Sequence, residues 1–144
     1  MNIASLLASK GNKVITIQPE QTVRQAVVLL VEHNIGAVVV VDPTRQPVGI
    51  LSERDIVRAA LRNDRVFSEP VAVLMTRDVI LGLPQDDLGS VGNTMTERRI
   101  RHLPVMEGGK LVGIVSIGDI VKAQRDQYLG EVETLQTQLL SESP

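Results

Sequence analysis

The chain has 144 residues, a formal net charge of −2 and no cysteine. At this length it can bury about 68–70% of its unfolded surface, which allows one domain or two small halves that share a core. Without cysteine, disulfides, thiolate chemistry and cysteine-ligated metals are excluded. The slightly acidic balance and the presence of only two aromatic residues, Phe67 and Tyr128, argue against a nucleic-acid surface.

No membrane-spanning or targeting segment is expected. The longest apolar run, Ala37–Val41, is far shorter than the roughly 20 residues that a spanning helix needs. The first ten residues carry no leading positive charge and have too short an apolar run for a secretory signal. We therefore expect a soluble cytoplasmic protein with no membrane partner.

In chain order, the first half predicts the elements β-α-β-β-α. The β-branched residues of 14–17, which end before Pro19, indicate a short strand. Thr22 is a good helix N-cap, and apolar residues at helical spacing follow it. The continuous apolar run 37–41 is typical of a strand buried on both faces. A turn at Asp42, a strand over 48–51 and a helix over 53–61 complete the order.

The second half predicts the same order after a polar connector, 62–70. A helical turn over 71–75 leads into it, as 3–7 leads into the first half. The elements that follow are a strand over 79–83, a helix over 87–98, strands over 102–106 and 110–115 joined by a Gly-Gly turn, and a helix from residue 117.

The tail helix carries apolar or neutral residues at steps of three and four, which form one narrow stripe. Two interpretations of this stripe are possible: it packs on its own domain, or it contacts a partner. Its residues are Val121, Gln124, Tyr128, Val132, Leu135 and Leu139.

An internal repeat fixes the architecture. Seven of ten positions are identical between residues 48–57 (Val-Gly-Ile-Leu-Ser-Glu-Arg-Asp-Ile-Val) and 112–121 (Val-Gly-Ile-Val-Ser-Ile-Gly-Asp-Ile-Val). We therefore predict an α/β (α+β) fold of two pseudo-symmetric repeats packed sheet to sheet, plus a long C-terminal helix. The expected boundaries are 1–61 for repeat 1 with its helical lead-in, 62–70 for the connector, 71–124 for repeat 2 and 125–144 for the helical tail.

The repeat also duplicates a polar motif, Gly-x-x-Ser-x-x-Asp, at Gly49, Ser52 and Asp55 and again at Gly113, Ser116 and Asp119. Glycine allows another group to approach a strand closely. The serine is a good N-cap, and the aspartate one turn later can accept hydrogen bonds from the two hydroxyls of a ribose. Ser-x-x-Asp is also a near capping box. A cap gives no reason for the duplication, which favours the ligand interpretation.

The β-α-β-β-α duplication with this motif resembles a tandem pair of CBS (cystathionine β-synthase) domains, the Bateman module. The stretch Ile100–Val105 is similar to a second signature of that family. The resemblance implies a regulatory module that binds AMP, ADP, ATP, NAD or S-adenosylmethionine in clefts between the repeats. It implies that Asp55 and Asp119 hold ribose, with Ser52 and Ser116 assisting. The implied aliphatic walls are Val14, Ile15, Ile35 and Ala37 for the Asp119 site, and Val79, Ile80 and Ile100 for the Asp55 site.

Phosphates need cations, and the resemblance places Arg101 and His102 at positions that often meet them. Arg54, beside Asp55 at a helix start, is a third candidate. Solvated arginines and an ordinary strand histidine are the alternatives. The first copy has Gly36-Ala37 where the second has Arg101-His102. The two clefts should therefore be inequivalent.

No catalytic pattern, metal-ligand spacing or phosphate-binding loop supports an enzyme, so we expect neither catalysis nor a catalytic cofactor. The expected role is adenine-nucleotide sensing for an unknown target protein in trans, in a homodimer such as the family often forms. The alternatives are a dimerisation scaffold whose motifs only cap helices, or an S-adenosylmethionine sensor.

Overall fold

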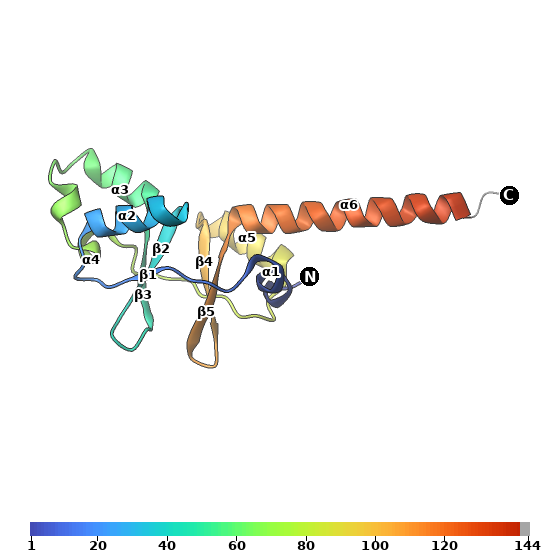
Figure 1. Cartoon of the computed structure of the whole chain (residues 1–144), viewed down its shortest axis with the longest axis horizontal. Helices are drawn as coiled ribbons and strands as arrows, with labels where there is room; N and C mark the ends of the chain where they lie inside the picture. Colours follow the sequence, from blue (N-terminus) through green and yellow to red (C-terminus); the bar gives the residue numbers. More distant parts are fainter. Residues whose placement is uncertain (142–144) are drawn as a thin grey trace.

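The structure, a computed structural model, describes residues 1–141. Two halves stand side by side, each with a β-hairpin and flanking helices, and one long helix runs out from the second half (Figure 1). The predicted mixed α/β architecture with a long C-terminal helix is confirmed. Residues 142–144 of the predicted tail lie outside the described part of the chain.

The first half contains a three-stranded sheet in the order β1-β2-β3, with β1 parallel to β2 and β2 antiparallel to β3. All of β2 is buried, as its continuous apolar run predicted. Thr22 caps the following helix through a capping box with Gln25. The elements are β1 (Thr16–Ile17), α2 (Val23–His33), β2 (Ala37–Val41), β3 (Pro47–Ser52) and α3 (Glu53–Ala60).

The second half repeats this order without the first strand, and its sheet is an antiparallel hairpin of two strands. Asp87 caps its first helix by accepting a hydrogen bond from the Ser90 amide at 3.0 Å. The elements are α5 (Leu88–Arg98), β4 (His102–Glu107), β5 (Lys110–Ser116) and α6 (Ile117–Ser141). The connector is not merely polar, because it contains a short 3-10 helix, η1 (Val66–Ser68), whose first residue is buried.

The predicted strand over 79–83 is wrong. Only Gly82 pairs with β4, through a single parallel bridge to Val105. The next bond of a parallel ladder would run from the amide of residue 104 to the carbonyl of Ile80, but Pro104 has no N–H. The first copy has Val39 at the equivalent position, and its amide donates to the Ile15 carbonyl at 3.3 Å. One proline therefore removes the strand from the second copy.

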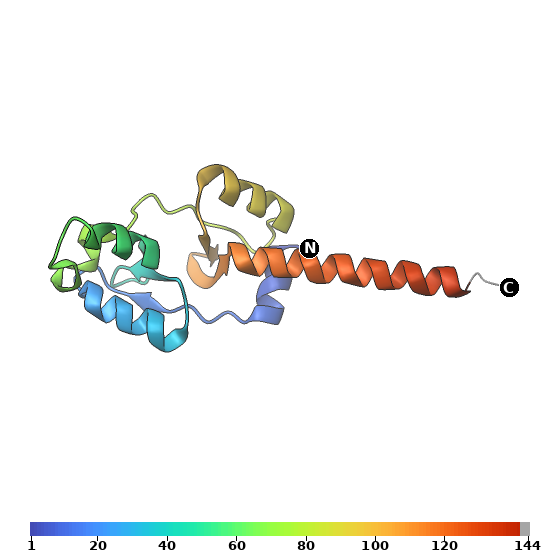
Figure 2. The same ribbon diagram turned by 90° about the horizontal axis from the view of Figure 1, so that it is seen from above.

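The short helices that precede the two halves are exchanged between them (Figures 1 and 2). Helix α1 (Ile3–Lys10) buries Ile3 and Leu6 in the core of the second half. Helix α4 (Val71–Leu74) buries Val71 in the core of the first half, which also contains Leu51. The expectation of one shared core is wrong, since the buried side chains form two clusters. Each cluster contains the helix that precedes the other copy in the sequence, and this exchange interlocks the halves.

The exchange explains the motif glycines. A Cβ added at Gly49 would lie 2.6 Å from Met75 Sδ and 3.0 Å from the Thr76 carbonyl oxygen. A Cβ at Gly113 would lie 2.8 Å from both methyl groups of Leu7. In each copy the exchanged segment packs on the glycine of the opposite motif. The backbone oxygen of Thr76 leaves no room for a side chain at Gly49, whereas at Gly113 the Leu7 side chain would have to shift. The predicted contact of both glycines with a ligand stays a prediction.

The C-terminal helix α6 leaves the domain after its first turns and extends alone (Figure 1). Ile120 is fully buried in the second core, whereas Val121, Tyr128 and Leu135 of the predicted stripe are each more than half exposed. The stripe therefore does not pack on its own domain. None of the helices in residues 1–141 has the length and apolar character required to cross a membrane.

Candidate ligand site

The two Ser-x-x-Asp motifs adopt the same structure at the starts of α3 and α6. The Ser52 hydroxyl accepts from the Asp55 amide at 3.2 Å, and the Ser52 amide donates to Asp55 Oδ2 at 3.0 Å. The corresponding distances between Ser116 and Asp119 are 3.1 and 2.9 Å. Both motifs are therefore capping boxes, each worth about 1 kcal/mol of stability.

Capping uses only half of each carboxylate. In both motifs the bonds reach Oδ2, and no hydrogen bond from residues 1–141 reaches Oδ1 of Asp55 or Asp119. Both side chains are half-buried at the surface of their halves. Because a carboxylate has about four acceptor positions, the cap and a ligand can be served by the same group. The aspartates can therefore cap their helices and bind a ligand at the same time.

A cleft of about 300 Å³ opens between the start of α3 and the second half. Arg54 lines it from the first copy, and Arg99 and Arg101 line it from the segment that joins α5 to β4. No acidic side chain is among its lining residues, so the cleft attracts anions. Asp55 follows Arg54 in the same helical turn but does not line the cleft itself. The other lining residues are Met95, Thr96, Ile100 and Ile117.

This cleft unites Arg54, Ile100 and Arg101, three of the residues that the sequence pointed to. The sequence did not single out Arg99, which ends α5 with a left-handed φ of 55° and so turns the chain toward β4. The run of arginines around it was visible, but a charge run does not reveal which side chains a turn brings together. The apolar lining residues of α5 and α6 had no signal beyond their helical spacing.

The other predicted wall residues do not line this cleft. Ile15 and Ile35 pack against the first core, Ala37 is buried in β2 and Ile80 packs against the second core. Val14 and Val79 are half-buried in the segments before β1 and Gly82. Their contact with a ligand stays a prediction.

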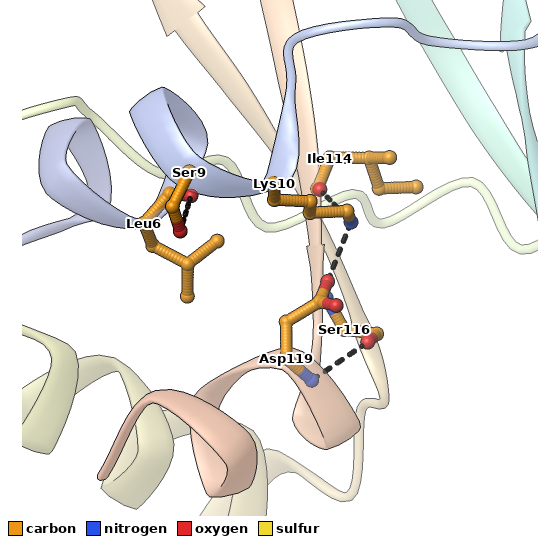
Figure 3. Close-up of polar contacts among 6 residues, drawn as sticks. All are labelled: Leu6, Ser9, Lys10, Ile114, Ser116 and Asp119. Atoms are coloured by element: carbon orange, nitrogen blue, oxygen red, sulfur yellow. Dashed lines mark hydrogen bonds and ion pairs between the residues drawn. The ribbon is translucent and has the colours of Figure 1, made fainter. Parts of the chain in front are cut away.

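A lysine that was not predicted from the sequence as a site residue lies at the second motif (Figure 3). Lys10, the last residue of α1, places Nζ 2.5 Å from Asp119 Oδ2 and 2.7 Å from the Ile114 carbonyl oxygen. Burial would raise the pKa of Asp119, but the hydrogen bonds from Lys10 and Ser116 outweigh it and hold this pKa below its ordinary value. Lys10 lies outside the repeated pattern, so comparison of the two copies gave no signal for it.

His102 lies where the two halves meet. A Cβ added at Gly36 of the first copy would lie 3.4 Å from its Nε2. Burial and then the charge of Lys10 lower the pKa of His102, although Asp119 and Glu53 act in the opposite direction. The imidazole is therefore neutral at pH 7. It can offer a phosphate a hydrogen bond but not a full charge.

This lowered pKa predicts a loss of stability in mild acid. Below pH 6.5 His102 binds a proton in the unfolded chain more readily than in the folded chain. The free energy of unfolding should therefore decrease as the pH is lowered, by at most about 1.4 kcal/mol per pH unit. Urea denaturation at pH 7.5 and 5.5 measures this. His102→Gln should flatten the difference, and His33→Gln, at an exposed histidine, should keep it. Equal slopes in both variants would contradict the assignment.

Comparison with known proteins agrees with this fold. The family model described as "CBS domain" matches residues 7–62 and 71–126. The CBS domain-containing protein YhcV of Bacillus subtilis is 33% identical over 85% of this chain and 86% of its own. The CBS-domain protein ATU1752 of Agrobacterium tumefaciens superimposes with a TM-score of 0.83 at 39% identity, over 86% of this chain and 99% of that one.

The two matched segments and the exchanged helices define a tandem pair of CBS domains, and the chain belongs to the CBS domain family. Proteins with CBS pairs are commonly regulatory and bind adenosyl ligands. The CBS pair of protein MJ0100, solved in complex with 5-methylthioadenosine and S-adenosyl-L-methionine, is similar to this chain. Its TM-score is 0.79 at 26% identity, over 88% of this chain and 98% of that one.

Proposed function

We propose that this protein is a regulatory module that binds a phosphorylated adenosine, such as AMP, ADP, ATP or NAD, between its two CBS domains. The observation that carries the proposal is the cleft lined by Arg54, Arg99 and Arg101 next to Asp55. Asp55 Oδ1 would accept from the ribose hydroxyls, and the guanidinium groups would hold the phosphate, since arginine suits phosphate oxygens.

The charge of the cleft decides between ligand classes. S-adenosylmethionine, which the similar MJ0100 pair binds, carries a sulfonium cation on the carbon where AMP carries a phosphate. Three arginines and no acidic side chain line the cleft among the described residues, which opposes a cation there and favours an anion. The structure's electrostatics thus support a nucleotide over the adenosyl sulfonium.

Regulation requires a target, which we propose to be another protein bound in trans. The exposed stripe of α6, with Tyr128 and Leu135, is the surface that we assign to homodimer formation or to target contact. A scaffold without a ligand would use the same stripe. The scaffold alternative, however, does not account for the arginine cleft.

Titration calorimetry with AMP tests the proposal. Asp55→Asn can still accept the capping bond from Ser52 but loses its charge, and it should weaken AMP binding about tenfold, as expected for one charge-assisted hydrogen bond. Asp64→Ala, at an exposed aspartate of the connector, is the matched control and should bind as the wild type does. Wild-type protein that takes up neither AMP, ATP nor NAD would refute the proposal and leave the scaffold.

A further inference from the structure

The two aspartates differ in what already occupies them. Asp119 Oδ2 is held by the Lys10 ammonium, with the two side chains only 33% and 25% exposed. Within residues 1–141, Asp55 has no ion-pair partner. The ammonium of Lys10 donates to the carboxylate that would bind a ribose, and it also donates to the Ile114 carbonyl on the adjoining strand (Figure 3).

The difference follows from the lengths of the exchanged helices. Helix α1 has eight residues and α4 has four, and Lys10 lies in the additional turn. Helix α4 lacks this turn, and no lysine or arginine of the described residues pairs with Asp55. The longer α1 thereby gives the Asp119 motif an internal cation, which the Asp55 motif lacks within residues 1–141.

We propose that Lys10 is a built-in competitor at the Asp119 motif: it neutralises the carboxylate and occupies Oδ2, so both ribose hydroxyls can bind there only after the ammonium is displaced. The inference rests on the proposed function and goes beyond it, because it ranks the two sites. Nucleotide binds first at Asp55. At Asp119 only Oδ1 is open, so a ribose whose two hydroxyls use both carboxylate oxygens must break the bond from Lys10 to Oδ2. Lys10 thus determines which of two otherwise alike motifs is the weaker.

Only the end of α1 needs to move for this displacement. Ile3 and Leu6 anchor the start of the helix in the second core, whereas Gly11, directly after Lys10, has a φ of 102° and no atom near the position of a Cβ. The chain can therefore pivot at Gly11 without disturbing the buried residues. The segment after Gly11 leads to β1 of the first half. Displacement of Lys10 would therefore shift backbone that connects the two halves.

The test measures adenosine binding to Asp55→Asn protein, in which the Asp55 site is weakened. Adenosine is uncharged, so the charge of Lys10 neither attracts nor repels it at long range. In that background Lys10→Met should bind adenosine about tenfold more tightly, the factor that corresponds to 1.4 kcal/mol. Lys10→Arg, which keeps the charge, should stay weak. Lys13→Met, at an exposed lysine three residues further on, should have no effect.

The outcomes separate this inference from the proposed function. If Lys10 only stabilises the fold, Lys10→Met will lower the unfolding free energy without raising affinity, and the inference is wrong while the function stands. If neither the wild type nor any variant binds adenosine or AMP, the function falls and the inference falls with it. Tighter binding that disappears again in Lys10→Met/Asp119→Asn protein would support the competitor role.

Discussion

Truncating Leu6 to alanine should destabilise the protein by about 2–5 kcal/mol, the usual cost of a large-to-small change in a core. Leu6 lies near the chain's beginning, where substitutions are commonly tolerated. It is nevertheless only 4% exposed and packs with Val115 and Ile120 of the second half. Urea denaturation followed by circular dichroism measures the effect.

The same substitution at Leu61, which is 89% exposed at the end of α3, is the matched control and should change stability by less than about 0.5 kcal/mol. A small effect at Leu6 would mean that α1 does not belong to the second core. In that case the exchange of lead-in helices, and the position of Lys10 that depends on it, would both be wrong.

The sequence predicted those parts of the fold that depend on local chemistry. The caps at Thr22 and Ser52 and the buried run of β2 were predictable because a hydroxyl or an apolar stretch acts within a few residues. The repeat then supplied the order of the elements in the second half from that in the first.

Features that depend on contacts between distant segments were not predictable in the same way. Pro104 removes a strand bond whose acceptor lies more than twenty residues earlier, so a reading of 79–83 alone expects a strand. Gly49 and Gly113 were correctly singled out as points of close approach. What approaches them is an exchanged segment carrying Met75 or Leu7, which the periodicity of either copy cannot show.

The candidate site was predictable to the same degree. Ser52, Asp55, Arg54 and Arg101 follow from the repeated motif and the family resemblance, and the structure brings Arg54 and Arg101 into one cleft. Lys10 has no counterpart in the second copy, and it reaches Asp119 across 109 positions of sequence. Only the packing of α1 places it there.

Removing charge from the arginine cleft should have the largest effect on binding. Arg54→Gln combined with Arg101→Gln should weaken AMP binding about 30-fold, less than two fully buried charged hydrogen bonds would cost because both side chains are exposed and screened by water. Adenosine should bind to the variant as it does to the wild type. The comparison of the two ligands by calorimetry isolates the phosphate.

The matched control is Arg62→Gln with Arg65→Gln, which removes two exposed arginines from the connector and leaves the cleft intact. It should reproduce wild-type affinity for both ligands, which would show that net charge alone does not govern binding. If the cleft variant loses AMP and adenosine equally, these arginines shape the pocket rather than hold a phosphate. An adenosyl ligand without phosphate would then fit this protein better, because affinity would depend on the diol and the base alone.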